Sequence, residues 1–240
     1  MKKILTTAIL CAGLVGFTAC DSFLDEDPKS SLTLDTYYKT SADIIGNVNY
    51  LYRDGAPDKM GNMTGAYRGS SLSVMNMVTG YFVNEYEGQE VDCSYARQLT
   101  RQDFTQSCCN YLTNDTWKSC YKSINVANAV IKYVDGVEMD NQAQYKAEAR
   151  FFRALNYFCD VPMVTEPTED ATLVEYPTRT AASEVFNTVI IPDLQFAVEN
   201  LPNATFAGNS HRVTKYAADM LLADVYMRLG EYANAVTPLK

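Results

Sequence analysis

The stretch that decides the fold is AEARFFRALNYFCDVPM, residues Ala147–Met163. Its alanines leave room for a neighbouring backbone to approach closely: Ala147, Ala149 and Ala154. Its large apolar side chains recur three or four residues apart, as they do on one face of an α-helix: Phe151, Phe152, Leu155 and Phe158. This spacing predicts a tightly packed helix over residues 147–158.

The charged residues and the proline of the same stretch complete this prediction. Glu148, Arg150 and Arg153 are expected on the wetter sides of the helix. Pro162 disfavours helical backbone in the residue before it, so a turn at 160–162 is expected to end the helix. On physical grounds alone, the stretch predicts a core helix and its exit turn, with no chemistry of its own.

A second long helix is expected just before this stretch. Apolar and small residues recur at intervals of three and four between Trp117 and Val134. The expected ends of this helix are Thr113 or Asn114 and Gly136. Trp117, the only tryptophan, is expected to fill the core. This helix and the helix that carries Phe151 would form a helical hairpin of tetratricopeptide type. Such a hairpin buries its apolar face by stacking on the next helical hairpin.

Three further helices are expected elsewhere in the chain. Their expected starts are Ser41, Thr180 or Ser183, and Thr214. Pro192 is expected to kink the second of them. In the third, small and bulky side chains alternate over 214–235, with a turn at Gly230. The pattern therefore predicts an all-α fold of tetratricopeptide-like helical hairpins with long irregular loops.

The first nineteen residues are typical of a secretory signal peptide. Two lysines precede a short apolar segment, Ile4–Phe17, which is too short to span a bilayer. The following Thr18-Ala19-Cys20 resembles a bacterial lipobox, so Cys20 is expected to carry a lipid anchor, with plain secretion as the alternative. The expected organisation is a signal peptide at 1–19, an anchor and tether at 20–40, and a helical domain at 41–240.

Four motifs in the chain resemble the SusD/RagB family of outer-membrane nutrient-binding lipoproteins. The stretch Ala147–Met163 is similar to the family's E-A-R-F-L-R-A-x-x-Y-F … G-D-V-P-L core. The other three are C-x-x-F-L-D-x-x-P from Cys20, W-x-x-x-Y-x-x-I-x-x-A-N from Trp117 and I-x-x-D-L-x-x-A-x-x-x-L-P from Ile190. The resemblance covers nearly all of the chain from Cys20 to Lys240.

The resemblance implies a SusD-like fold and a lipid-anchored, surface-exposed outer-membrane protein without catalysis. Such a protein captures an oligosaccharide and passes it to a TonB-dependent transporter of SusC type. The chain departs from the family in two ways. It lacks about two helical turns before the D-V-P motif, and family members are roughly twice its length. We therefore expect the N-terminal part of such a protein, in a truncated chain with an incomplete binding surface.

Residues 55–112 are rich in glycine and aromatic residues, with weak periodicity. A segment this aromatic is expected to be ordered, and long irregular segments in compact domains are usually functional. Tyrosine rings beside amides and guanidinium groups can form a carbohydrate platform. The residues expected to contact ligand are Tyr81, Tyr86, Tyr95 and Arg97. The alternative is that these loops pack on the helical body.

Composition and motifs argue against nucleic-acid binding and catalysis. The chain has 29 acidic and 20 basic residues, a net charge of -9, which disfavours phosphate-rich partners. His211 is the only histidine, so a His-based triad or a two-His metal site cannot form within one chain. No phosphate-binding glycine motif occurs. We expect no enzyme activity, cofactor or metal; a lipid-tethered tetratricopeptide scaffold is the main alternative, and a glycosidase a distant third.

Overall fold

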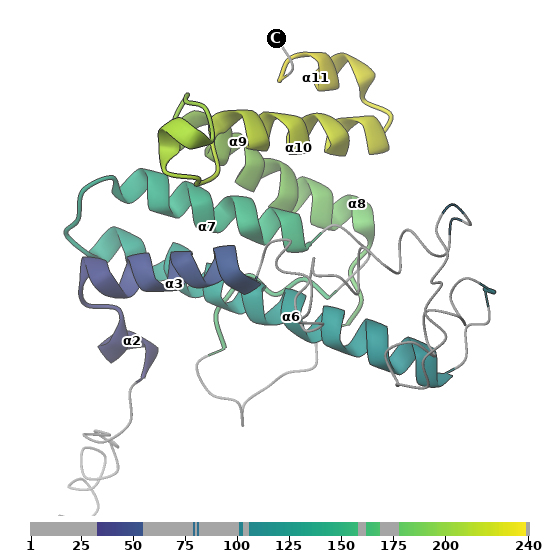
Figure 1. The fold of residues 1–240 in the computed structure, drawn as a ribbon, viewed down its shortest axis with the longest axis horizontal. Coiled ribbons are helices and arrows are strands. Elements are labelled where there is room, and N and C mark those ends of the chain that lie inside the picture. The colour runs from purple at the N-terminus through teal and green to yellow at the C-terminus, as the bar shows by residue number, and fades with distance from the viewer. Residues whose placement is uncertain are drawn as a thin grey trace, which may run out of the picture. The chain divides into compact units, whose positions relative to one another are not determined.

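The computed structural model describes residues 33–54, 79, 81, 101–102, 106–157, 162–168 and 178–238. The chain divides into two units between Tyr37 and Tyr38. In the first unit the described element is the short helix α2, Leu34–Tyr37. All other described elements belong to the second unit, and they are helices and helical turns without any strand (Figure 1).

The helices of the second unit pack on one another in chain order. Its elements are α3 (Ser41–Asp54), α6 (Gln106–Tyr133), the 3-10 turn η2 (Val134–Gly136), α7 (Gln142–Asn156), α8 (Ala182–Val185), the π turn η4 (Phe186–Ile190), α9 (Ile191–Asn200), the 3-10 turn η5 (Ala207–Asn209), α10 (Lys215–Arg228) and α11 (Tyr232–Val236). Helix α3 packs on α6, α6 on α7, α7 on α9, α9 on α10, and α10 on α11. This nearest-neighbour stacking is typical of helical repeat proteins and confirms the predicted fold class.

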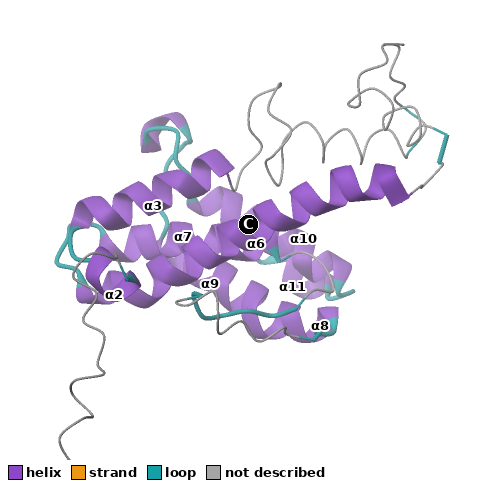
Figure 2. Ribbon diagram, turned by 90° about the horizontal axis from the view of Figure 1, so that it is seen from below, coloured by secondary structure: helices purple, strands orange, loops and turns teal. Residues whose placement is uncertain are grey.

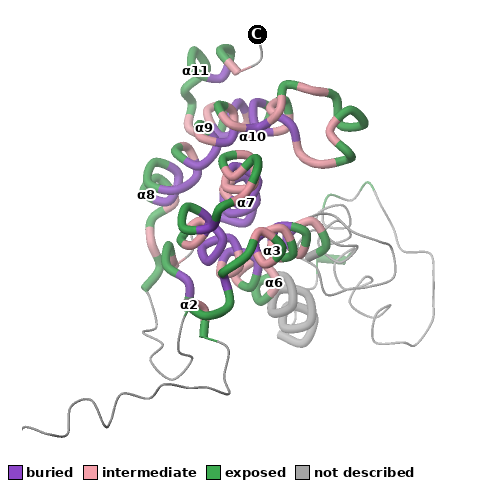
Figure 3. Tube along the Cα trace, turned by 90° about the vertical axis from the view of Figure 1, so that its left-hand side faces the viewer, coloured by how far each residue is buried: buried purple, intermediate pink, exposed green. Residues whose placement is uncertain are grey.

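Helix α7 lies in the middle of this stack and confirms the predicted packed helix up to Asn156, where it ends. Phe158 and residues 160–161 of the expected exit turn lie outside the described residues. The three alanines of the quoted stretch are fully buried: Ala147, Ala149 and Ala154. Phe151 and Phe152 are also buried, with their rings edge to face at a centroid distance of 5.5 Å. Burying each such ring contributes roughly 1.5–3 kcal/mol. Figure 3 shows the buried positions along α7, α9 and α10.

Two charged residues of α7 lie in the core, which corrects their expected exposed position. Arg153 donates to both carboxylate oxygens of Asp193 on α9, through Nε at 2.6 Å and Nη2 at 2.8 Å. Its Nη1 donates to Asn128 Oδ1 on α6 at 2.9 Å. Periodicity places a charge in solvent by default, but a fully paired guanidinium can be buried. The result is a charged link between α6, α7 and α9.

Glu148 is the second buried charge on α7, with 0% of its surface exposed. Arg212, in the loop before α10, donates from Nε to both of its carboxylate oxygens at 3.0 Å. The Tyr52 hydroxyl of α3 also donates to Glu148, at 3.0 Å, and accepts from the Val213 amide at 2.8 Å. Burial, with the neighbouring Glu148 charge, raises the pKa of Tyr52. This cluster fixes the entry to α10 against α3 and α7.

Helix α6 differs from the prediction at its N-terminal end. It begins at Gln106, so neither Thr113 nor Asn114 is its cap. Trp117, expected in the core, is 48% exposed and lies against Tyr121 with a ring-centroid distance of 4.9 Å. The reason is that the N-terminal part of α6 runs beyond the region where α3 and α7 pack on it (Figures 1 and 2). An apolar stripe becomes a core only where another element covers it.

The remaining helix boundaries follow the sequence closely. Helix α3 begins at Ser41 and α10 follows Thr214, as predicted. The expected start at Thr180 or Ser183 is wrong, since Ala181 is the N-cap of α8. Before Pro192 the chain forms a π turn, in which the Ile191 amide donates five residues back. Because proline has no amide hydrogen, the helix must rearrange its bonding at this point.

Candidate ligand groove

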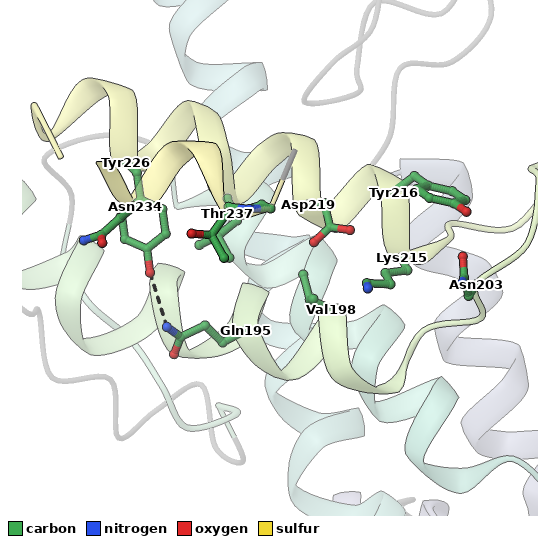
Figure 4. A pocket seen from close by; sticks show the side chains of 11 residues that line it. Gln195, Val198, Asn203, Lys215, Tyr216, Asp219, Tyr226, Asn234 and Thr237 are labelled. Atoms are coloured by element: carbon green, nitrogen blue, oxygen red, sulfur yellow. Dashed lines mark hydrogen bonds between the residues drawn. The ribbon is translucent and has the colours of Figure 1, made fainter. Parts of the chain in front are cut away.

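A groove of about 640 Å³ lies between α9, α10 and α11 (Figure 4). Its walls combine side-chain amides, hydroxyl groups, two tyrosine rings, one ammonium group and one carboxylate. The lining residues are Gln195, Val198, Asn203, Lys215, Tyr216, Asp219, Leu222, Tyr226, Asn234, Thr237 and Pro238. Such a mixture of apolar surface and a few convergent polar groups is typical of a small-ligand site.

Helical spacing explains why these side chains converge. Four residues of α10 recur at intervals of four, three and four, which aligns them along one side of the helix: Lys215, Asp219, Leu222 and Tyr226. Gln195 and Val198, three residues apart on α9, form the opposite wall. Gly230 has φ of 75°, which glycine adopts without strain, and the chain turns there into α11. Helix α11 then adds Asn234 to the groove.

One hydrogen bond ties two walls of the groove together. Gln195 Nε2 on α9 donates to the Tyr226 hydroxyl on α10 at 3.3 Å, as drawn in Figure 4. The amide oxygen of Gln195 is not used in this bond, and the Tyr226 hydroxyl keeps its own hydrogen to donate. The pair therefore offers both an acceptor and a donor to a ligand in the groove.

The Asp219 carboxylate lies between α10 and α9 in Figure 4. Only 7% of the residue is exposed. Burial raises the pKa of Asp219, and the positive charge of Lys215, one turn earlier, opposes this rise. Among the described residues, no donor makes a hydrogen bond or ion pair with this carboxylate. Its two oxygens remain accessible from the groove, since neither is among the buried side-chain atoms that lack a hydrogen-bond partner.

Tyr81, the predicted ligand residue that the structure describes, does not line the groove. Tyr81 is 89% exposed, and its amide donates to Thr79 Oγ1 at 3.4 Å. Tyr86, Tyr95, Arg97 and the predicted lipidation site Cys20 lie outside the described residues, so these assignments stay predictions. The sequence signal for the groove was an acid inside an apolar stripe, where Asp219 sits beside Ala218 and three residues before Leu222.

Two further features of the described residues concern membranes and metals. No helix among them is both long and apolar enough to cross a lipid bilayer. In the same part of the chain, no three side chains of the metal-binding types His, Cys, Asp and Glu come together.

The stack of helices defines an α-helical repeat protein, and the groove lies at one end of it. Residues 22–227 match the sequence profile of the SusD-like family described as "Starch-binding associating with outer membrane". The chain therefore belongs to the SusD-like family, which confirms the resemblance found in its motifs. SusD-like protein P2 of Formosa agariphila is 28% identical over 244 residues, covering 98% of this chain and 45% of that protein.

Solved structures support the same fold. A SusD-like carbohydrate binding protein from Bacteroides fragilis has a TM-score of 0.69 at 19% identity, covering 85% of this chain and 40% of that one. Surface glycan-binding protein A from Bacteroides fluxus has a TM-score of 0.63 at 20% identity, covering 80% and 41% of the two chains. This chain spans less than half the length of the curated relatives it matches.

Proposed function

We propose that this protein captures an oligosaccharide at the outer membrane and delivers it to a TonB-dependent transporter of SusC type. It would hold the sugar without cutting it, and a lipid on Cys20 would keep it on the membrane, exposed at the cell surface. The observation that supports this proposal best is the groove between α9, α10 and α11. It combines amides, hydroxyls and tyrosine rings on a fold of the SusD-like family.

The chemistry of the groove suits a sugar better than an apolar or highly charged ligand. Gln195, Asn203 and Asn234 carry amides that can donate to and accept from hydroxyl groups. Tyr216 and Tyr226 offer flat rings with a polar tip, which fit the mixed apolar and polar faces of a pyranose. A printed array of oligosaccharides, followed by calorimetry on the best-retained one, tests the proposal. We expect saturable binding, and no retention of any glycan would refute it.

Anchoring and delivery need separate tests. If Cys20 carries the lipid, Cys20→Ser should abolish incorporation of a labelled fatty acid and release the protein from the membrane fraction. If the chain serves a transporter, pull-down from detergent-solubilised membranes should recover a large outer-membrane barrel. Labelling that persists in the variant would contradict the anchor, and recovery of the chain alone would contradict the transporter.

A second function is favoured by apolar side chains exposed at the same end of the stack. Three of them share one side of α10 and two lie on α11: Tyr216, Met220, Met227, Tyr232 and Val236. An exposed apolar patch is typical of protein contact sites. A lipid-tethered tetratricopeptide scaffold that grips a protein would use such a surface. Co-purification with a membrane protein, together with failure to bind any glycan, would favour this alternative.

A further inference from the structure

A polar stripe on α6 lies beside the irregular segment of residues 162–168. The members of this stripe are four, three and four residues apart, which places them on one side of the helix: Tyr121, Asn125, Asn128 and Lys132. Within the described part of the chain, no backbone–backbone hydrogen bond holds the segment. Side chains bind its main chain instead, although most main-chain groups in proteins pair with other main-chain groups.

The stripe binds both ends of the segment through main-chain groups. The Tyr121 hydroxyl donates to the Pro162 carbonyl at 2.8 Å. At the other end, the Thr168 amide donates to Asn125 Oδ1 at 2.7 Å. Every peptide carries such groups, so these two bonds hold the segment without depending on its side chains.

The middle of the segment is bound in the same way. Asn128 Nδ2 donates to the carbonyls of Val164, at 2.8 Å, and Glu166, at 3.3 Å. The hydroxyl of Tyr157, just after α7, donates to the Val164 carbonyl at 2.6 Å and accepts from the Val164 amide at 2.9 Å. Arg153 donates to Asn128 Oδ1 at 2.9 Å. Because the arginine fixes the amide with its hydrogens toward the segment, the stripe is preorganised for binding.

The side chains of the segment add little to its attachment. Pro167 is buried, whereas Thr165, Glu166 and Thr168 are exposed. Lys132 lies 3.9 Å from the Glu166 carboxylate, and 41% and 78% of the two side chains are exposed, so water weakens this pair. Detaching the segment would therefore expose little apolar surface, which is the property of parts that open without global unfolding.

We propose that the α6 stripe is a peptide-binding site for the main chain of an extended, proline-bearing segment, and that residues 162–168 occupy it as an internal, releasable ligand. The proposal goes beyond glycan binding and does not depend on it, because the groove is built from other helices. Pro162 and Pro167 fix their own φ angles, which lowers the entropy lost on binding. A peptide from another protein must compete with a segment that is held nearby at high effective concentration.

Hydrogen exchange in the full chain tests whether the segment detaches. The amides of Val164 and Thr168 are compared with the Phe152 amide in the middle of α7. We expect both to exchange more slowly than in a free peptide, and at least about tenfold faster than Phe152. Protection equal to that of Phe152 would overturn the proposal, because the segment would then leave only on global unfolding. Absence of any protection would overturn it as well, because the stripe would then not hold the segment.

Binding in trans tests whether the stripe is a peptide site. In one variant a glycine–serine sequence of equal length replaces residues 162–168, and a fluorescent peptide of those residues is titrated into it. Anisotropy should show saturable binding, at least about tenfold tighter than to wild type, whose stripe is occupied. A peptide N-methylated at the Val164 amide lacks one donor and should bind at least about tenfold more weakly. A peptide with Thr165→Ala is the matched control and should bind like the unmodified one.

Three results of the binding experiment would overturn the proposal. They are no binding of the peptide to the replaced variant, equal binding of the N-methylated and unmodified peptides, and loss of the helical circular dichroism signal in the replaced variant. The last result would mean that the segment is a required part of the core rather than a ligand of it. Hydrogen exchange of the wild-type chain gives an independent answer in that case.

Discussion

The carboxylates of the helical core and the carboxylate of the groove differ in whether an arginine binds them. Asp193 and Glu148 each meet an arginine through two or more hydrogen bonds. Asp219 meets none among the described residues, and its carboxylate oxygens stay accessible from the groove. The core acids join α6, α7 and α9, or α7 to the entry of α10. The groove acid joins no two elements.

The core acids have arginine partners, whereas the groove acid has none among the described residues. A buried ion pair gives little net stability, but it becomes a large penalty when one partner is removed. The two arginine clusters therefore fix α9 and the start of α10 in position. Because these clusters fix both walls of the groove, α9 and α10 keep their positions while Asp219 has no partner among the described residues. Four substitutions test this comparison, in decreasing order of expected effect.

The largest effect is expected for Arg153→Met. The change keeps a long apolar stem but leaves Asp193 buried, with Arg150 at 3.8 Å as its remaining cation. Removing one partner of a buried pair typically costs about 3–5 kcal/mol. Chemical unfolding in urea should show this loss as a lower midpoint with an unchanged slope. Arg228→Met, which removes an exposed arginine, is the control. A loss of unfolding free energy no larger than that of the control would mean that the Arg153–Asp193 cluster does not stabilise the packing of the helices.

A smaller effect is expected for Glu148→Gln. Glutamine keeps the shape and one acceptor for the Tyr52 hydroxyl, but it loses the charge that holds Arg212. Because Arg212 is partly exposed, its guanidinium can turn to water, and the loss should be about 1.5–3 kcal/mol.

The effect of Glu148→Gln should be local. Hydrogen exchange should accelerate at the Val213 amide, which donates to Tyr52, more than at amides of α9. Uniform acceleration throughout the protein would contradict a local clamp and point to loss of the whole fold.

Much of the fold could be predicted from the sequence, because most of its helices are covered along a regular apolar stripe. Helix α7 shows this best: its alanines and phenylalanines are buried where a period of 3.6 places them. The same rule failed for Glu148 and Arg153, since periodicity assigns charges to solvent and cannot see a partner far away in the chain. Arg212 is 64 residues from Glu148 in the sequence.

The candidate site was harder to predict, because it depends on three helices rather than on one motif. The tyrosines of residues 55–112 predicted a ligand contact at Tyr81. The groove is instead lined mainly by residues of α9, α10 and α11. The prediction that Trp117 lies in the core was wrong for a related reason. The apolar stripe of α6 continues past the part of the helix on which α3 and α7 pack. A single sequence gives the face of a helix, but not whether another helix lies on it.

A smaller change, of opposite sign, is expected for the stability of Asp219→Asn. At neutral pH the variant should be slightly more stable than wild type, because burial disfavours the charged form of Asp219 in the folded protein. The pKa of Asp219 is raised in the folded state. The folded protein therefore binds this proton more tightly, and the resulting stability is fully present below the unfolded pKa of about 3.9 and is lost as pH rises.

The difference between Asp219→Asn and wild type should consequently disappear toward pH 4 and be greatest near pH 7. Among the described residues that line the groove, Lys215 is the one charged group besides Asp219, and those of α9 and α11 are uncharged. Unfolding midpoints measured across this range would check the prediction. An advantage of the variant that is constant with pH, or a variant less stable than wild type at neutral pH, would show that Asp219 has a structural partner.

The smallest effect is expected for Asp224→Asn, five residues further along α10. Asp224 accepts from Arg228 Nε at 3.1 Å, one turn later, and both side chains are largely in solvent. Exposed pairs at this spacing contribute about 0.3–0.5 kcal/mol, and salt screens even that. The variant should unfold within about 0.5 kcal/mol of wild type, and within less in 0.5 M salt. A loss as large as that of Glu148→Gln would remove the distinction on which the comparison rests, because surface and core acids would then stabilise the protein alike.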